Sequence, residues 1–357
     1  MTTPLPIEEI LSGSVPAADL EEVGRSRDGR PIGAWRGGRG PQSVSLVAGC
    51  HADEPVGPAT LRRLAAWLAS RPENDPAVAE VRWSIVPHAN PDGEAVNAVW
   101  ATRTLEVADH QGVADRGFDL AAYSAGVVRE RPGDDVEFGF PRSAHDNEAR
   151  PENRAVAGFL ADGAPYDVHG SLHSMAFAPG PWFLIEEGWA ERTTAMRGRL
   201  RRRVLEMDYV LFDPDRGGEK GFSRIDEGFT TRPDSGAMRR HFLERGDPDT
   251  AALFRPSSME HVRSLGGDPL TFVSEMPLFL LPPPGAARDF PDPASGSKGR
   301  VAFHRWLADL LTGRSDAEVA RAATSHGIRP MPLRDQARLQ LEFLNAVLAT
   351  APAQRQS

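Results

Sequence analysis

The chain has 357 residues, of which 40% are hydrophobic and 25% are charged, as in ordinary soluble globular proteins with one large domain or two smaller ones. Its formal net charge of −9 argues against a nucleic-acid partner, which would favour a basic face. The sequence shows no apolar stretch long enough to cross a membrane and no signal-peptide pattern, so we expect a cytoplasmic protein without a membrane partner.

The first part of the chain predicts alternating strands and helices. Ile32–Trp35 and Ser43–Ala48 have the short apolar runs of strands and are joined by a glycine-rich turn. Pro58–Ser70 has apolar residues at helical spacing, and Val81–Pro87 is the next strand, with a turn at Asn90–Gly93. This strand–helix–strand order requires a parallel crossover. We therefore expect an α/β fold with a mixed, mostly parallel sheet flanked by helices.

The later part of the chain continues this pattern after an interruption. Residues 101–149 are polar and aperiodic, and a stretch of that length without regular structure is often functional. Beyond it, the sequence predicts a helix over Glu152–Leu160 and strands over Tyr166–Leu172 and Leu270–Ser274. Two further helices are expected near the C-terminus, at Val301–Leu311 and Arg334–Leu348.

A candidate metal site follows the Ser43–Ala48 strand. His51 and Glu54 lie just past its carboxyl end, where open α/β sheets bind ligands, and their spacing lets both side chains reach one ion. His169 and His173 lie on or just after another predicted strand. Either histidine would complete a set of two histidines and one glutamate, which is a known ligand set of catalytic zinc.

Two neighbours of the His51–Glu54 pair limit the kind of metal site that the sequence predicts. Pro55 keeps Glu54 in a loop before the helix, and it occupies the place where an inverted zincin motif needs its second histidine. Cys50 is the only cysteine, so no intramolecular disulfide can form. Its thiolate could join the metal site, but we interpret Cys50 as a small buried residue at a strand end.

Several motifs, in this order, resemble the zinc carboxypeptidases of the carboxypeptidase A type. They are His51-Ala52-Asp53-Glu54, Asn90-Pro91-Asp92-Gly93, Pro151-Glu152-Asn153-Arg154, Ser171-Leu172-His173-Ser174 and Glu275. The resemblance implies that zinc is held by His51, Glu54 and His173. His169 is the rival third ligand, and otherwise a residue that lines the cleft or supports a ligand.

The same resemblance implies roles for two carboxylates. Glu275 falls at the position of the family's general base, which takes a proton from the activated water and passes it to the leaving nitrogen. Glu186 and Glu187 are the competing candidates for this base. Asp119 matches the aspartate that supports the first histidine, and a helix or turn cap is the alternative reading of Asp119.

The predicted substrate pocket departs from the family pattern. The family follows its aspartate with an Asn-Arg pair that grips the substrate's terminal carboxylate, whereas this chain has Ala121-Ala122. Arg103 loosely matches the family arginine that polarises the scissile carbonyl, and Arg150 could restore a positive group near the cleft. A solvated side chain is the alternative for each arginine. Without the clamp we expect little preference for standard C-terminal peptide substrates.

These patterns together predict a zinc-dependent hydrolase that cleaves a peptide or amide bond, in a peptide or small-molecule substrate, by metal-activated water. One alternative is a deacylase or amidase acting on an N-acyl amino acid or a related small amide. Another is a catalytically silent relative that retains the metal. Residues 1–285 would form the catalytic domain, and residues 286–357 a C-terminal helical extension packed on it.

Overall fold

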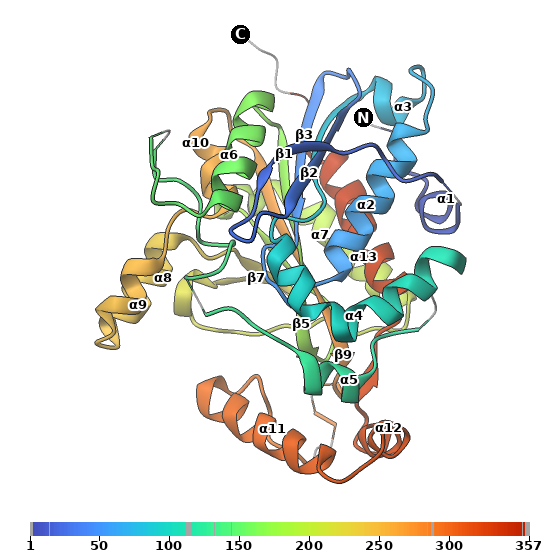
Figure 1. Ribbon diagram of the computed structural model, residues 1–357, viewed down its shortest axis with the longest axis vertical. Coiled ribbons are helices and arrows are strands. Elements are labelled where there is room, and N and C mark those ends of the chain that lie inside the picture. The colour runs from blue at the N-terminus through green and yellow to red at the C-terminus, as the bar shows by residue number, and fades with distance from the viewer. Residues whose placement is uncertain are drawn as a thin grey trace.

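The computed structural model describes residues 3–13, 15–111, 116–131, 133–143, 145–283, 285–286, 289–351 and 353, without the side chains of residues 103, 106–111 and 297. The chain folds around one sheet with helices on both faces (Figure 1). This is the mixed α/β architecture predicted from the sequence, with parallel strands at its centre. Within the described residues, no helix combines the length and the apolar character needed to span a membrane.

The strand order places late and early parts of the chain side by side. Across the sheet the described strands are β1 (Glu21–Arg25), β2 (Pro31–Gly37), β4 (Val81–Val86), β3 (Gln42–Ala48), β5 (Val168–Ala178), β9 (Leu270–Leu280), β6 (Trp182–Ile185), β8 (Phe229–Thr231) and β7 (Arg224–Asp226), and β10 (Arg329–Pro330) pairs with β9. β4, β3, β5 and β9 are parallel, whereas β2 and β6 pair antiparallel with this central group. All seven residues of β3 are buried, as predicted for a central strand.

A step in the sheet lies at the end of β3. Ala48, the last residue of β3, pairs with Leu172 of β5, but β5 and β9 continue side by side as far as Ala178 and Leu280. The prediction that these two strands end at residues 172 and 274 was therefore wrong. His173 and Glu275 lie within strands and pair directly with each other, so their side chains share one face of the sheet.

The helices form layers on the two faces of the sheet. In chain order they are α1 (Ile7–Ser12), α2 (Val56–Ala69), α3 (Pro76–Ala79), α4 (Pro91–Gln111), α5 (Leu120–Gly126), α6 (Pro151–Gly163), α7 (Thr194–Glu206), α8 (Ser235–Glu244), α9 (Pro248–Leu253), α10 (Ser258–Ser264), α11 (Gly296–Leu311), α12 (Asp316–Ser325) and α13 (Leu333–Leu348). α2, α7 and α13 share the largest hydrophobic cluster with one face, and α6 packs on the opposite face. The alternation of side chains in β3 supplies both clusters, Val44 and Leu46 to the first and Val47 to the second.

The predicted turn at Asn90–Gly93 and the aperiodic stretch after it are partly helical. α4 begins at Pro91 and runs to Gln111, and α5 follows within the same stretch. The side-chain oxygen of Asn90 accepts a hydrogen bond of 3.0 Å from the backbone N–H of Gly93, which caps the start of α4. α4 exposes Val96 and Val99. Its apolar residues therefore do not follow one buried stripe, which is why periodicity did not reveal it.

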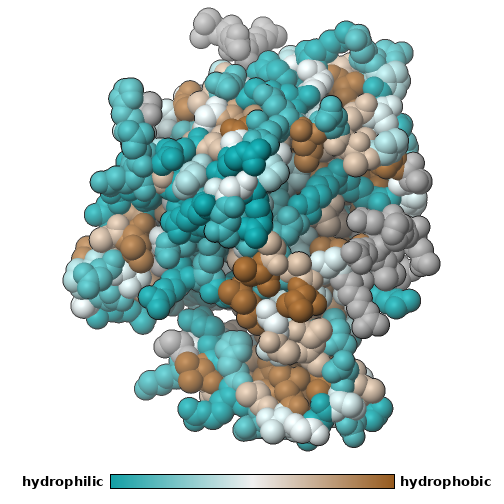
Figure 2. Space-filling model, viewed as in Figure 1, coloured by the Kyte–Doolittle hydropathy of each residue, from teal (hydrophilic) through white to brown (hydrophobic). Residues whose placement is uncertain are grey.

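The C-terminal residues divide between two locations. α11 and α12 form a separate layer at the bottom of Figure 1, and Phe303 of α11 packs against Phe177 with ring centroids 5.0 Å apart. A groove of about 630 Å³ lies between α4–α5 and α12, and Figure 2 shows apolar side chains gathered in this region. α13 instead enters the main core, where Phe343 contacts Phe183 and Phe272. The domain boundary near residue 285 stays a prediction.

Candidate metal centre and active site

Three of the predicted ligands converge at the step beside β3. Nδ1 of His51 lies 2.8 Å from Oε1 of Glu54, and Nδ1 of His173 lies 2.8 Å from Oε2 of the same carboxylate. The two Nδ1 atoms are 3.2 Å apart, and the ligand atoms of the three residues lie within 4.8 Å of one another. Two imidazole nitrogens and one carboxylate are the donor set of catalytic zinc sites, so these residues fit the metal.

The turn after β3 explains how His51 reaches this position. Gly49 adopts a left-handed φ of +66°, and a Cβ at this position would lie only 2.5 Å from Nδ1 of His88. Glycine is therefore required at position 49, both by its conformation and by the ring packed behind it. The backbone N–H of Ala89 donates a 2.8 Å hydrogen bond to the carbonyl of Ala48, which fixes the end of β3. The chain then passes His51 and Glu54 before α2 begins at Val56.

The charges of His51, Glu54 and His173 favour a cation at this site. Burial would raise the pKa of Glu54, but the positive charges of His51 and His173 outweigh it and lower that pKa. Burial would lower the pKa of His51, but the charge of Glu54 and its hydrogen bond raise it to about 9. The pKa of His173 is raised in the same way, by Glu54 and Glu137. Buried carboxylates therefore hold positive charge at this position, as a metal site requires.

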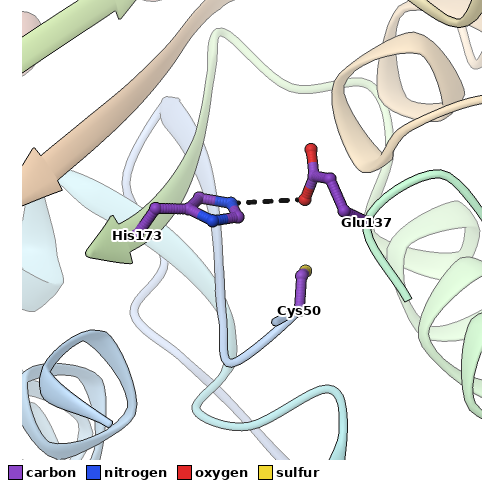
Figure 3. Close-up of side chains that lie close together, drawn as sticks. All are labelled: Cys50, Glu137 and His173. Carbon is purple, nitrogen blue, oxygen red and sulfur yellow. Dashed lines mark ion pairs between the residues drawn. The ribbon is translucent and has the colours of Figure 1, made fainter. Parts of the chain in front are cut away.

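Glu137 supports His173 from the other side of its ring. Oε2 of Glu137 lies 3.2 Å from Nε2 of His173, and the Ser171 hydroxyl lies 2.7 Å from the same nitrogen. Figure 3 shows the carboxylate of Glu137 facing this imidazole, with Cys50 beside them. An acceptor on the second nitrogen of a ligating histidine fixes its tautomer and orientation. Glu137 therefore supports His173, a contact that the sequence analysis did not predict.

Cys50, Glu137 and His173 form a second buried group whose ligand atoms lie within 4.8 Å of one another. Burial and the negative charge of Glu137 raise the pKa of the Cys50 thiol well above its ordinary value. The thiolate is the form that binds metals, and it is disfavoured here. This agrees with the interpretation of Cys50 as a small buried residue at the strand end.

The role predicted for Asp119 needs correction. Its carboxylate accepts a 2.8 Å hydrogen bond from the backbone N–H of Ala122 and caps α5 from an exposed position. The helix-cap alternative therefore holds. Burial and the charge of Glu54 have the largest effects on the pKa of His51, and the negative charge of Asp135 also raises it.

Asp135 also changes the match to the family motif. Glu137 and Phe138 occupy the second and third positions after Asp135, where the family has its Asn-Arg pair. Neither residue can supply the positive fork of that clamp, so it is missing whichever aspartate is matched. Asp135-Val136 and Asp119-Leu120 are both an aspartate followed by an aliphatic residue. The sequence analysis matched Asp119-Leu120 to the family motif and passed over Asp135-Val136, which begins in the same way.

His169 lies on β5 but belongs to a different hydrogen-bonded group. Its Nδ1 lies 2.8 Å from the Ser45 hydroxyl, and its Nε2 lies 3.0 Å from the Ser258 hydroxyl. Both nitrogens face serine hydroxyls and neither hydrogen bond reaches the metal trio, so the described structure groups His173, and not His169, with His51 and Glu54. The role of His169 in supporting a ligand stays a prediction.

Glu275 lies beside the metal trio, in the position predicted for the base. It pairs with His173 across the β5–β9 ladder. Burial, together with the negative charge of Glu54, raises the pKa of Glu275 to about 8. Glu186 is committed elsewhere, because it accepts a 2.6 Å hydrogen bond from Arg232, and Glu187 is exposed.

Arg129 is a cation at the site that sequence reasoning missed. Its guanidinium lies 3.4 Å from Asp53 and 3.6 Å from Glu54, and 57% of its side chain remains exposed. Its charge also lowers the pKa of Glu275. Arg103 was predicted to polarise the scissile carbonyl, but its side chain lies outside the described residues. Arg129 falls in the aperiodic stretch that was expected to be functional, with no motif to single it out.

Arg150 is buried and paired with two carboxylates of the protein. Only 9% of its side chain is exposed, and it pairs with Glu130 at 2.9 Å and with Glu152 at 3.5 Å. It also donates a 3.0 Å hydrogen bond to the carbonyl of Asp134. The reading of Arg150 as a solvated side chain is therefore wrong, and its role as a substrate contact stays a prediction. Arg150 instead ties the start of α6 to the segment that carries Glu137.

Comparison with known families agrees with this geometry. Residues 11–178 match the family model described as zinc carboxypeptidase. This part of the chain is similar to the zinc carboxypeptidase family. The matched residues include His51, Glu54 and His173, whereas Glu275 lies beyond them. The resemblance seen in the sequence is thus confirmed over the segment that carries the three candidate ligands.

Solved structures give a weaker likeness. A metallo-carboxypeptidase from Burkholderia cenocepacia is 14% identical, with 96% of this chain and 67% of that chain covered and a TM-score of 0.47. A metallo-carboxypeptidase from Pseudomonas aeruginosa, in complex with (2-guanidinoethylmercapto)succinic acid, is 17% identical, with 97% and 68% covered and a TM-score of 0.45. The comparison with curated proteins found no match. Likeness of this size says nothing about the substrate of this chain.

Proposed function

We propose that the chain is a zinc-dependent hydrolase that cleaves an amide or peptide bond at the centre formed by His51, Glu54 and His173. The observation that supports this most is the convergence of these three donors, one of which, His173, pairs directly with Glu275 in the sheet. A zinc ion held there would lower the pKa of water and supply a nucleophile near neutral pH.

The surrounding residues would perform the remaining steps. Glu275 has a pKa raised to about 8 by burial and by Glu54, which suits a group that accepts a proton and then donates it. It would take the proton of the attacking water and deliver it to the leaving nitrogen. Arg129 would stabilise the negative charge that develops on the carbonyl oxygen. Glu137 would hold His173 in its ligating orientation.

A deacylase or amidase of small amides is the preferred form of this activity. The observation that favours it over a standard carboxypeptidase is the missing Asn-Arg clamp, replaced by Glu137-Phe138 or by Ala121-Ala122. A catalytically silent relative is less well supported, because a partly buried carboxylate occupies the base position beside the ligands.

Metal analysis combined with a substrate screen tests this function. We expect about one zinc per chain in the wild type and in His169→Ala, and strong zinc loss in His51→Ala and His173→Ala. Zinc that survives in His173→Ala but not in His169→Ala would move the third ligand to His169. The screen uses N-acyl amino acids and short peptides, and a zinc-loaded protein that hydrolyses none of them would contradict the proposed activity.

A further inference from the structure

Arg129 lies on a segment without regular structure. α5 ends at Gly126, and residues 127–130 form neither a helix nor a strand. The guanidinium nevertheless has a defined place, with Nε 3.4 Å from Oδ2 of Asp53 and Nη2 3.6 Å from Oε1 of Glu54. Because an arginine side chain has many rotamers, the backbone that carries it must be fixed before its guanidinium can be aimed.

The side-chain amide of Asn97, on α4, fixes this backbone. Its oxygen accepts a 2.9 Å hydrogen bond from the N–H of Val128, and its Nδ2 donates one of 2.9 Å to the carbonyl of the same residue. The same Nδ2 donates a 2.9 Å hydrogen bond to the carbonyl of Ala52. Asn97 is 2% exposed, so water competes little for these bonds. Asn97 therefore joins two backbones, and the residues that directly follow its two partners are Asp53 and Arg129.

This arrangement requires an amide at position 97. The side-chain oxygen faces two donors, the N–H of Val128 and the indole N–H of Trp100 at 2.7 Å, whereas the nitrogen faces carbonyl oxygens. A carboxylate would bring negative oxygens against those carbonyls, and an aliphatic side chain would satisfy neither set. Both polar atoms of Asn97 are engaged with the protein, so its effect on a substrate must pass through its partners.

A second asparagine fixes the other side of Arg129. Asn90 directly precedes α4 and lies about two helical turns before Asn97, so both asparagines lie on one side of this helix. The Nδ2 of Asn90 donates a 2.6 Å hydrogen bond to Oε2 of Glu130, and Oε1 of Glu130 accepts one of 2.9 Å from Arg150. The residues before and after Arg129 are therefore both anchored.

Asp53 holds the guanidinium from its buried side. Asp53 is 3% exposed and meets Nε of Arg129, whereas 57% of the arginine side chain is exposed. Nη2 lies beside Glu54, so this nitrogen is directed to the metal centre. Because the guanidinium is planar, a contact at Nε sets the direction of its terminal nitrogens.

We propose that Asn97 is a positioning residue that holds Arg129 in place for the carbonyl oxygen of the substrate, with Asp53 as its partner in this role. This rests on the proposed function, in which Arg129 stabilises the charge that develops on that oxygen. Asn97 sets the backbone of Val128 against that of Ala52, and Asp53 sets the direction of the guanidinium. An arginine from an aperiodic stretch thus reaches the centre because a neighbouring helix supplies its fixed points.

Turnover of single and double variants tests this role. Arg129→Gln removes the cation, and loss of one group that stabilises the oxyanion commonly lowers kcat by about 100- to 1,000-fold. Asn97→Ala should lower kcat by roughly 10- to 100-fold through misplacement of Arg129, with little change in KM. The double variant should be no slower than Arg129→Gln, because Asn97 acts only through Arg129. Losses that multiply in the double variant, or full activity in Asn97→Ala, would overturn the proposal.

Asn345→Ala is the matched control. The oxygen of Asn345, on α13, accepts a 2.8 Å hydrogen bond from the N–H of Leu5, and its Nδ2 donates one of 3.0 Å to the carbonyl of Leu5. Asn345 thus makes the same pair of bonds to one backbone residue, and its loss should lower stability but leave kcat unchanged. Zinc content and urea unfolding are measured on every preparation. Asn97→Ser, which keeps a hydroxyl that can donate and accept, takes the place of Asn97→Ala if the latter does not fold.

Binding of inorganic phosphate separates the positioning role from the proposed function. Calorimetry on the zinc-loaded protein reports how well Arg129 holds an anion at the centre, without any need for turnover. The phosphate Kd should rise roughly tenfold or more in Arg129→Gln, by a similar factor in Asn97→Ala, and no further in the double variant. This result without any hydrolysis would support the positioning role and contradict only the proposed function. No phosphate binding by the wild type, binding that is unchanged in Asn97→Ala, or multiplied losses in the double variant would overturn the positioning role.

Discussion

Nε2 of His173 lies 3.2 Å from Oε2 of Glu137, while Nδ1 of the same ring lies 2.8 Å from Oε2 of Glu54. The imidazole is therefore held between two buried carboxylates, one on the metal side and one behind it. Burial would raise the pKa of Glu137, but the charge of His173 outweighs this effect and lowers it, so the supporting carboxylate is ionised. A ligand supported in this way is more basic and better oriented.

Glu137→Gln should weaken zinc binding. Glutamine keeps the size of the side chain and an acceptor for Nε2 of His173 but removes the negative charge. We expect the zinc dissociation constant to rise roughly 10- to 100-fold, measured by competition with a chelator. Glu148→Gln, an exposed carboxylate further along the same segment, is the control and should bind zinc as the wild type does. Unchanged affinity in Glu137→Gln would remove the supporting role.

Glu275→Gln should abolish turnover without releasing zinc. The amide cannot take a proton from water, and loss of a general base commonly lowers the rate by about a hundredfold or more. The measurement is kcat on a substrate from the screen, with zinc content determined on the same preparation. Glu187→Gln changes an exposed glutamate and should keep full activity. If Glu275→Gln turned over normally, another group would have to be the base.

Arg150→Met should destabilise the fold and leave substrate preference unchanged. The substitution leaves Glu130 and the fully buried Glu152 without their cation. Breaking a buried ion pair in this way lowers the free energy of unfolding by about 3–5 kcal/mol, which urea titration can measure. Arg202→Met, at an exposed position, should change it little. Normal stability combined with a lost preference for free carboxylates would instead make Arg150 a substrate contact.

Acidification should lower the free energy of unfolding, partly because His169 is protonated in the unfolded chain. Burial, followed by the charge of Arg232, lowers the pKa of His169 to about 3, below the value of about 6.5 in an unfolded chain. The unfolded chain therefore binds the proton first, so stability that is present above pH 6.5 is lost as the pH falls towards 3. Between pH 6.5 and 5, the wild type should lose roughly 1.5 kcal/mol more unfolding free energy than His169→Gln.

The control for this acid effect is His145→Gln, which replaces an exposed histidine and should follow the wild type. Urea titrations of the three proteins at several pH values give the comparison. Parallel pH curves for the wild type and His169→Gln would show that His169 is not the group responsible.

The elements that carry His51, Glu54 and His173 could be predicted because their signals are local. The buried run of β3 and the residues directly after it suffice for the first two ligands. The end of β5 could not be found in this way. The strand was predicted to end at Leu172, whereas pairing with β9 extends it to Ala178. Tertiary pairing overrides composition at such positions.

The supporting residues were harder to predict because their positions depend on the folded chain. Glu137 and Arg129 come from a stretch without periodicity, and distant contacts hold that stretch in place. One of these contacts is the ion pair of Arg150 with Glu130. Asp119 had the better local sequence match, but it caps a helix instead. A local sequence match cannot show which of the two aspartates, Asp119 or Asp135, lies near a histidine in the folded chain.

The place of β9 in the sheet determines when the candidate site can form during synthesis. β9 lies between β5 and β6, although β6 precedes it by the whole segment that carries α7 to α10. During synthesis, the middle of the sheet cannot close until residue 280 has left the ribosome, because long-range pairing must wait for its partner. The metal ligands are made early and Glu275 arrives with β9. The growing chain therefore carries its candidate metal ligands before it carries the proposed base, and the two can be brought together only after β9 has been made.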